Sequence, residues 1–419
     1  MKRVVITSYA RTPFSSQNGR EFIQTSIPEL ALMPFNAAIE RSRLGKSDID
    51  GVIMGQMDSG TGEAANLARH VALKAGLDYT TACGYTVNRI CGSGFTAVIN
   101  NMMDMWLDEG NVFVSAGCEM NSHKLVSLPL SYAWTGIPRG GIKLGGRDYD
   151  GDPCTPVEIF GVIPSMGFTA DKAARIYGVT REDSDVFAYD SQMKAIKAQE
   201  SGRFEAEIVP IEVRTTDKKG KVSTVAYDKD LHLKPQSSLE VMRTLPAVFD
   251  KDGVVTAGSA SGSVDGAAAI VLMTEDEAKK RELPPIAYLN AYAYAGVDPT
   301  IMGIGPAPAI LKLLKKTGLR LDEIDVVEIN EAFAAQVLAC LKILDQELGP
   351  GHYIGSKFYE KLNPNGGAVA IGHPEGCTGV RLTLTVAEEL RRTGKRYGIC
   401  SACIGGGMGV AILLENARM

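Results

Sequence analysis

Apolar and polar positions along the chain follow two periods, one typical of buried strands and one typical of amphipathic helices. Short apolar runs predict strands that are buried on both faces, and longer stretches with helical spacing predict helices that end at glycine. In the first part of the chain this pattern predicts strands at 3–8, 49–54 and 111–116, helices at 30–42 and 64–75, and a third helix after Cys91. In the last part it predicts strands at 286–293, 324–329, 396–402 and 410–414, and helices at 307–316, 331–348 and 376–392. Strands that alternate with helices in this way indicate an α/β fold whose sheet is covered on both faces.

The middle of the chain departs from this alternation. Glycine and proline break up residues 140–156, and residues 218–234 are rich in charge, so we expect that segment to be exposed. One helix is clear, because Thr180 is a typical N-cap residue and Asp183 stands three positions later. Long irregular insertions often form a lid or a binding wall, so we interpret 121–252 as a loop domain inserted into the α/β fold.

The two α/β parts of the chain are similar to each other. In the first part Cys91 precedes a helix, and the strand after that helix ends at Cys118, 27 residues later. In the second part Cys377 opens a helix, and the next strand ends at Cys403, 26 residues later. Such a repeat indicates a duplicated fold. Two halves related by a pseudo-twofold axis would bring both helix-opening loops to one central cleft.

Composition narrows the functional classes. The 419 residues are 45% hydrophobic and 22% charged with a net charge of −5, which fits a globular protein and argues against a nucleic-acid partner. No apolar run approaches the roughly 20 residues that span a bilayer, and residues 3–8 already form a strand, so we expect neither a membrane segment nor a targeting peptide. The eight cysteines are scattered, which favours reduced thiols and a cytoplasmic location. Cys400 and Cys403 form a C-x-x-C pair, but no second pair completes a zinc site, so we expect no metal.

Cys91 is the first candidate for chemistry. It lies between a short apolar run and a Gly-Ser-Gly turn that opens a helix with apolar positions at Phe95, Val98 and Met102. Free N–H groups and the positive end of the helix dipole favour a thiolate there, so we expect the pKa of Cys91 to be lowered. A buried, inert cysteine before a helix explains the same pattern equally well. The segment alone leaves both interpretations open.

Two further segments place polar side chains at loop positions. His373 is flanked by glycines just before a helix, which allows the backbone to aim the imidazole into a cleft, although a surface loop histidine is the alternative. In Asn330-Glu331-Ala332-Phe333 a predicted strand gives way to a predicted helix. Asn330 is either an amide donor at the rim of the sheet or an ordinary N-cap residue.

Glycine and other small residues mark two more candidate loops. In Cys403-Ile404-Gly405-Gly406-Gly407 the glycines allow backbone N–H groups to form an anion-binding nest, or simply a tight turn between strands. No G-x-G-x-x-G lies between a strand and a helix here, so a dinucleotide site is not supported. Residues 257–266 are mostly small, which suits a long ligand lying against the backbone or a flexible loop.

Four separated motifs together resemble the thiolases, a family of acyl-CoA acetyltransferases. They are the segments 88–94 (NRICGSG), 330–333 (NEAF), 372–374 (GHP) and 403–407 (CIGGG), in the family's order. The resemblance covers nearly the whole chain. The asparagine at position 330 separates this sequence from the related ketoacyl synthases and from sterol-carrier-type thiolases, which usually have a histidine there.

The resemblance implies a duplicated, five-layered α-β-α-β-α fold with an inserted loop domain. It assigns 1–120 plus 253–275 to a first half with the nucleophilic cysteine, 121–252 to a loop domain that binds coenzyme A, and 276–419 to a second half. It also implies a homodimer or homotetramer that acts on acyl-CoA and CoA and needs no cofactor.

The resemblance also implies residue roles. Cys91 would be the acyl-accepting nucleophile, His373 its base and Cys403 the acid/base at the substrate α-carbon. Asn330, through a water, and Gly405, through its backbone N–H, would stabilise oxyanions. The implied substrate-binding residues are Ser261 and Ala257 along the pantetheine and Met166 and Phe333 near the acyl group.

Some positions depart from the family pattern. Ser165 stands where short-chain biosynthetic members usually have histidine, Ser259 stands where asparagine is common, and Glu375 and Cys377 replace an apolar and a small residue. Three hypotheses about the function remain. The first is an acetyl-CoA C-acetyltransferase that uses acetoacetyl-CoA, the second a 3-ketoacyl-CoA thiolase for longer chains, and the third a non-catalytic CoA-binding subunit.

Overall fold

A mixed β-sheet runs through the whole molecule. The structure is a computed structural model that describes residues 2–57, 65–124, 165–216, 220 and 222–418. In this part of the chain the sheet order is β3-β2-β4-β7-β1-β8-β11-β10-β9. The strands are β1 (Val4–Arg11), β2 (Gly51–Gly55), β3 (Cys83–Val87), β4 (Val112–Met120), β7 (Asp265–Thr274), β8 (Ala287–Gly296), β9 (Val326–Ile329), β10 (Tyr397–Ile404) and β11 (Met408–Asn416). Residues Val4 to Ile6 of β1 pair with Leu289 to Ala287 of β8, and this short contact joins the two halves.

The helices cover both faces of each half-sheet. They are α1 (Ile27–Ser42), α2 (Leu67–Lys74), α3 (Ser93–Trp106), α5 (Met166–Tyr177), α6 (Arg181–Glu200), α7 (Leu239–Thr244), α8 (Glu275–Lys280), α9 (Pro306–Thr317), α10 (Ala334–Leu348), α11 (Lys357–Lys361), α12 (Ala368–Ile371) and α13 (Glu375–Thr393). Short 3-10 turns are η1 (Lys46–Asp48), η3 (Asn121–His123), η4 (Pro299–Ile304) and η5 (Leu321–Glu323).

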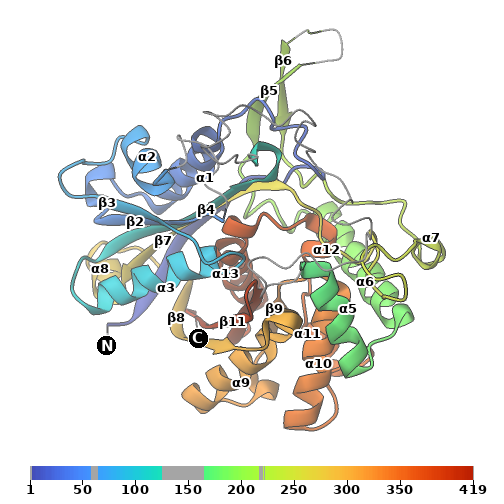
Figure 1. Cartoon of the computed structure of the whole chain (residues 1–419). Helices are drawn as coiled ribbons and strands as arrows, with labels where there is room; N and C mark the ends of the chain where they lie inside the picture. The colour runs from blue at the N-terminus through green and yellow to red at the C-terminus, as the bar shows by residue number, and fades with distance from the viewer. Residues whose placement is uncertain (1, 58–64, 125–164, 217–219, 221, 419) are drawn as a thin grey trace, which may run out of the picture.

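The fold has five layers, which are three layers of helices and two half-sheets, and three clusters of buried apolar residues hold these layers together. One cluster packs α1 and α2 against β2, β4 and β7. The central cluster holds α3 and α13, and α13 contacts strands of both half-sheets. The third packs α9 and α10 against β8 to β11. In Figure 1, α1 and α2 lie at the upper left and α9 and α10 at the bottom, with α3 and α13 between them. The duplicated α-β-α-β-α fold is therefore confirmed, with the two half-sheets joined at β1 and β8.

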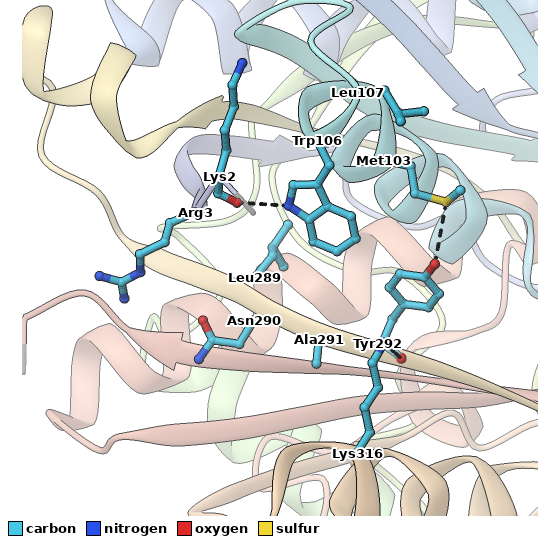
Figure 2. Close-up of a pocket in the computed structure, with 10 residues that line it drawn as sticks. All are labelled: Lys2, Arg3, Met103, Trp106, Leu107, Leu289, Asn290, Ala291, Tyr292 and Lys316. Atoms are coloured by element: carbon cyan, nitrogen blue, oxygen red, sulfur yellow. Dashed lines mark hydrogen bonds between the residues drawn. The ribbon is translucent and has the colours of Figure 1, made fainter.

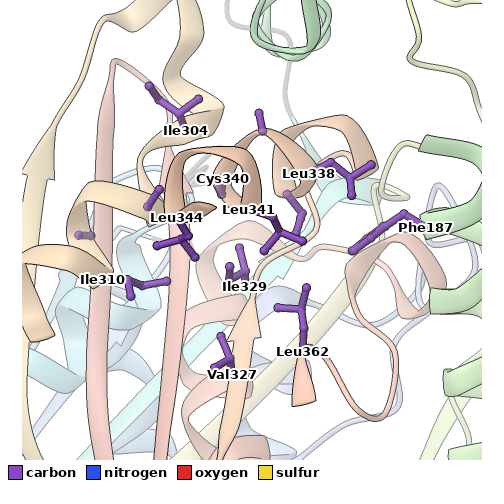
Figure 3. Packing of buried hydrophobic residues seen from close by; sticks show 14 of the residues in the cluster. Phe187, Ile304, Ile310, Val327, Ile329, Leu338, Cys340, Leu341, Leu344 and Leu362 are labelled. Atoms are coloured by element: carbon purple, nitrogen blue, oxygen red, sulfur yellow. The ribbon is translucent and has the colours of Figure 1, made fainter. Parts of the chain in front are cut away.

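The outer core of the second half holds β9 in place. Val327 and Ile329 of β9 pack under Leu338, Leu341 and Leu344 of α10, as Figure 3 shows. All five side chains are buried, so the end of β9 is fixed from behind. This rigidity is useful because the segment that follows β9 carries Asn330.

Helices α3 and α13 touch at their first turns. A Cβ atom on Gly94 would lie 2.9 Å from the carbonyl oxygen of Gly376 and from the backbone nitrogens of Gly379 and Val380. Only glycine permits this approach. It brings the segment before α3 and the segment before α13 together, as the repeat predicted.

Several predicted boundaries agree with the structure. The N-cap of α6 is Thr180, whose hydroxyl accepts from the Asp183 N–H (3.1 Å), while the Asp183 carboxylate accepts from the Thr180 N–H (3.2 Å). Helices α9 and α13 end at Gly318 and Gly394, both in the left-handed conformation. Strands β3 and β7 have no counterpart among the predicted elements.

The part of the insertion that the structure describes consists of α5, α6, α7 and a two-stranded ribbon, β5 (Ile211–Thr216) with β6 (Val222–Tyr227), which projects at the top of Figure 1. The glycine- and proline-rich stretch 140–156 lies outside the described residues. The predicted exposure of 218–234 is wrong at Asp230 and His232, which are buried. Asp230 accepts two hydrogen bonds from the buried Arg11 (2.7 and 2.8 Å), so the insertion is attached to β1 by an ion pair.

Candidate active site

One cavity of about 440 Å³ brings the main candidates together. Its lining includes Cys91 and His373, and it also includes the four residues predicted to bind substrate, namely Ala257, Ser261, Met166 and Phe333. Asn330, Cys403 and Gly405 are not part of this lining, but each of them contacts a residue that is. The cavity thus joins residues that lie more than 280 positions apart in the sequence.

Cys91 follows a strained turn. Ile90 has φ +49°, a left-handed conformation that is rare for a β-branched residue. Side chains hold the turn, because the Ile90 N–H donates to Asn88 Oδ1 (2.9 Å) and Ser93 Oγ donates to the Ile90 carbonyl (2.6 Å). Such strain costs about 1–3 kcal/mol and persists only where neighbours enforce it. The turn places Cys91 before Gly92, the N-cap of α3, and at the cavity wall.

The expectation that the pKa of Cys91 is lowered is wrong. Burial raises the pKa of this thiol well above its usual range, and the nearby Cys403 and Glu375 raise it further. Hydrogen bonds from the backbone of Gly405 and of Cys91 itself act in the opposite direction but are outweighed. The helix start therefore does not yield a thiolate on its own, because loss of hydration costs more than the helix terminus supplies. Cys91 needs a base.

His373 is held as a neutral base. Its backbone follows Gly372, which has φ +96° and leaves no room for a Cβ atom against Val264. The Thr378 hydroxyl donates to the Pro374 carbonyl (3.0 Å), so the contact of 2.7 Å between His373 Nδ1 and Thr378 Oγ1 requires Nδ1–H as the donor. This arrangement leaves Nε2 unprotonated, with Asn330 Nδ2 as a donor 3.4 Å away.

Burial lowers the pKa of His373 to about 4, while the charge of Glu375 works in the opposite direction. The imidazole is thus unprotonated at neutral pH and able to accept a proton at Nε2. The alternative of a surface loop histidine is excluded, because His373 is buried.

Asn330 lies beside the histidine rather than at a helix cap. Its Nδ2 is 3.4 Å from His373 Nε2, and its side chain is buried. The predicted helix start near Asn330 is wrong, since α10 begins at Ala334 with Phe333 as the N-cap. Residues 330–333 are not helical, and Phe333 is extended. The Ala332 carbonyl accepts from the Ser261 N–H (3.0 Å) and the Ala334 N–H donates to the Ser259 carbonyl (2.9 Å).

Glu331 anchors this segment. Its buried carboxylate accepts from Ser191 Oγ (2.6 Å), Asn363 Nδ2 (2.7 Å) and the Val369 N–H (3.1 Å). Three elements, α6, the 362–367 loop and α12, therefore converge on one side chain. A buried carboxylate with three donors fixes the backbone on which Asn330 is carried.

Cys403 and Gly405 belong to the hairpin of β10 and β11. Cys403 pairs with Gly409 across the strands, and its fully buried thiol packs with Met302 and Ala332 behind the cavity. Burial raises the pKa of Cys403 to about 12. The glycines form the tight turn between strands, and the Gly405 backbone also reaches the Cys91 thiol.

The described ranges hold no cluster of three or more histidine, cysteine, aspartate or glutamate side chains able to bind a metal ion. Within the same ranges, no helix is long and apolar enough to cross a bilayer.

A second hollow, shown in Figure 2, lies between α3 and β8. Trp106 stacks on Tyr292 there, and the Trp106 Nε1–H donates to the Lys2 carbonyl (2.9 Å). Its lining includes Arg3 and Lys316 but no cysteine, histidine or carboxylate side chain. The chemistry is therefore concentrated in the first cavity.

The fold and the cavity define a duplicated α/β protein with a thiol and an imidazole at the junction of its halves. Residues 4–276 match the family model described as thiolase, N-terminal domain, and residues 283–416 match thiolase, C-terminal domain. The chain belongs to the thiolase family.

Individual relatives agree with this assignment. The chain is 40% identical to the mitochondrial 3-ketoacyl-CoA thiolase of Mus musculus over 421 residues, covering 99% of both chains. It is also 40% identical to the acetyl-CoA acetyltransferase of Escherichia coli, covering 99% of this chain and 100% of the relative. A crystal structure of human mitochondrial 3-ketoacyl-CoA thiolase in complex with CoA superposes with a TM-score of 0.84 at 36% identity, covering 99% of this chain and 98% of the other.

Sequence reasoning missed three contributors to the site. Thr378 fixes the histidine tautomer, Glu331 anchors the asparagine segment, and Ile90 carries the strained turn. Glu331 stands inside a quoted motif, so its position next to Asn330 was a usable signal. The roles of Thr378 and Ile90 depend on three-dimensional contacts that periodicity does not contain.

Proposed function

We propose that this thiolase condenses two acetyl-CoA molecules to acetoacetyl-CoA and CoA, and catalyses the reverse thiolysis, through an acyl-Cys91 intermediate. The observation that carries the proposal is the shared cavity of Cys91 and His373, with His373 Nε2 unprotonated. The acetyl-CoA acetyltransferase of Escherichia coli, at 40% identity, supports the same substrate.

In the first half-reaction His373 accepts the Cys91 proton as the sulfur attacks the acetyl carbonyl of acetyl-CoA. The new C–S bond forms, the bond to CoA sulfur breaks, and the proton on His373 passes to the departing CoA thiolate. Both ionised partners are disfavoured by burial, so proton transfer and attack proceed together rather than through a stable thiolate.

In the second half-reaction Cys403 removes a proton from the methyl carbon of a second acetyl-CoA. The resulting carbanion attacks the acetyl group on Cys91, which releases the Cys91 thiolate and gives acetoacetyl-CoA. Cys403 acts as a thiolate here, so its proton first passes to the neutral His373, and the Cys91 thiolate released in this half-reaction takes that proton back. The electrostatic contact between Cys91 and Cys403 suits this exchange.

Oxyanion stabilisation is assigned to two groups of donors. Asn330, with a bound water and His373, faces one developing oxyanion, and the backbone N–H groups of Cys91 and Gly405 face the other. Each lost donor of this kind typically costs about 10²–10³ in rate.

The CoA site and the domain organisation complete the proposal. Ser261 and Ala257 contact the pantetheine, and Met166 and Phe333 contact the acyl group. The loop domain 121–252 covers CoA between a first half (1–120 plus 253–275) and a second half (276–419). The enzyme acts as a cytoplasmic homodimer or homotetramer without a cofactor. Support comes from the placement of all four side chains at the cavity and from the CoA complex of the human relative.

A mass measurement tests the catalytic proposal. Incubation with acetyl-CoA is expected to add one acetyl group to the wild-type chain and none to Cys91→Ala. If neither protein gains an acetyl group, the non-catalytic CoA-binding alternative replaces the proposal.

A longer-chain 3-ketoacyl-CoA thiolase is the second candidate. Ser165 at the start of α5 and the 40% identity to the mouse mitochondrial 3-ketoacyl-CoA thiolase favour it. Thiolysis rates across a series of 3-ketoacyl-CoA lengths separate the two candidates. A maximum beyond acetoacetyl-CoA would select the second.

A further inference from the structure

Glu375 is the one formally charged side chain among the described residues that line the catalytic cavity. It is the first residue of α13 and stands two positions after His373. The rest of the lining is apolar or neutral, including Met166, Phe249 and Phe333. An acyl group on Cys91 therefore shares the cavity with one acidic side chain and with several apolar ones.

The Glu375 carboxylate is held in place. Its Oε2 accepts a hydrogen bond from Asn121 Nδ2 (3.0 Å), and its Oε1 lies 3.6 Å from Lys124 Nζ. Asn121 is itself fixed, because the same Nδ2 donates to the Val264 carbonyl (2.8 Å). The side chain keeps 15% of its surface exposed, so water still reaches part of it.

The carboxylate is also close to the reacting groups. Its charge acts on both the Cys91 thiol and the His373 imidazole, in each case raising the pKa. An acyl group on the Cys91 sulfur consequently lies within the field of Glu375.

We infer that Glu375 is a specificity-determining residue that restricts the acyl group on Cys91 to short chains; this inference rests on the proposed thiolase function. An acetyl or acetoacetyl group is too small to cover the carboxylate. A long alkyl chain would replace the remaining water around it with methylene groups, and an ionised group that loses water without a new partner is strongly disfavoured. Asn121 and Lys124 already occupy only part of the acceptor capacity of the carboxylate, so the lost water is not replaced.

The test compares chain-length profiles of three variants of the full-length enzyme. For each protein the ratio of kcat/KM for 3-ketodecanoyl-CoA to kcat/KM for acetoacetyl-CoA is measured in thiolysis. Glu375→Leu is expected to raise this ratio about tenfold or more over wild type, and Glu375→Gln, which keeps a polar group of the same shape, is expected to raise it less. Glu347→Leu on the exposed end of α10 makes the same substitution far from the cavity, and its ratio is expected to equal that of wild type.

A ratio for Glu375→Leu within twofold of wild type would overturn the inference, as would a wild-type preference for the long substrate. Because the ratio is taken within each protein, a general loss of activity in a variant cancels. If Glu375→Leu does not fold, an unchanged ratio in Glu375→Gln overturns the inference in the same way. Failure of the wild type to cleave any 3-ketoacyl-CoA would instead refute the proposed function, so the two failures are distinguishable.

Discussion

Each half of the molecule supplies two cysteines, and these form two pairs across the halves. One pair takes part in the proposed chemistry and the other does not. Cys91, before α3 of the first half, acts electrostatically on Cys403 of β10 in the second half. In the mirrored arrangement, Cys377 in α13 of the second half acts on Cys118 of β4 in the first. Cys91 lines the cavity and Cys403 packs behind its lining, whereas Cys118 and Cys377 are buried in the apolar cores.

The difference between the pairs lies in the backbone and not in the residue type. Cys91 precedes α3 on the turn forced by Ile90, which brings its sulfur to the cavity wall with 8% exposure. Cys377 is the third residue of α13, inside the helix, and has no exposure. A cysteine near a helix start becomes reactive only where the turn before it opens to a cavity and a base.

The largest expected effect distinguishes the two helix-start cysteines. Cys91→Ala is expected to reduce thiolysis of acetoacetyl-CoA by about 10⁴-fold or more, since the covalent route is lost. Cys377→Ala is expected to retain activity within about twofold of wild type. Steady-state assays at neutral pH measure both. Comparable losses in the two variants would contradict the assignment of chemistry to one pair.

The second largest effect is expected to distinguish Cys403 of β10 from Cys118 of β4. Cys403→Ala is expected to lower kcat by about 10²–10⁴, because the acid/base at the substrate α-carbon is removed. The acetyl adduct on Cys91 should still form, since acylation does not require that proton. Intact-mass analysis together with the condensation assay checks both statements, with Cys118→Ala as the control. Loss of the adduct in Cys403→Ala would show that this thiol is needed earlier.

The base in the second half sets the acid side of the pH profile. Because the pKa of His373 is lowered to about 4, kcat/KM is expected to be level from about pH 5 to 8 and to fall about tenfold per pH unit below about 4. The free energy of unfolding should decline over a higher pH range than kcat/KM does. The unfolded chain takes up a proton at the ordinary histidine pKa of about 6.5, so unfolding becomes more favourable as pH falls from about 6.5 towards 4.

Initial rates after brief exposure to each pH separate these two processes, since activity that returns at neutral pH was not lost through unfolding. An acid limb near pH 6.5 would mean that burial of His373 does not lower its pKa in the free enzyme.

A smaller effect is expected from the residue that orients this base. Thr378→Val removes the acceptor of the His373 Nδ1–H. The tautomer with an unprotonated Nε2 is then no longer favoured, so kcat should fall about tenfold. Thr383→Val on the same helix is the matched control, because its hydroxyl donates to the Gly379 carbonyl (2.7 Å) and contacts Cys400 Sγ (3.7 Å), and neither of these residues lines the cavity. Thr378→Ser should restore most of the activity. Equal losses in both valine variants would point to general damage to α13.

Sequence patterns predicted the larger organisation well. Helical spacing and terminal glycines located α9 and α13, and the repeat of the cysteine spacings indicated the duplication. The motif around His373 also predicted its place in a cleft. These features succeed because they are local, or because the second half repeats the first.

The failures have tertiary causes. The non-helical course of 330–333 depends on pairing with Ser259 and Ser261, more than 60 residues earlier. The pKa of Cys91 is raised by burial in the folded protein, whereas the sequence shows only the helix start that would lower it. Neither local propensity nor residue spacing reveals how much water the folded protein removes from around a side chain.

The smallest effects concern the buried pair, Cys118 and Cys377. Each thiol is fully buried, so replacement by alanine leaves a small cavity and should lower the free energy of unfolding by about 1 kcal/mol while activity persists. Because the two side chains interact, the double variant should differ from the sum of the single variants. Urea unfolding with an unchanged m-value measures all three. Strict additivity would show that this pair does not mirror the contact of Cys91 with Cys403, and the resemblance between the halves would then end at the backbone.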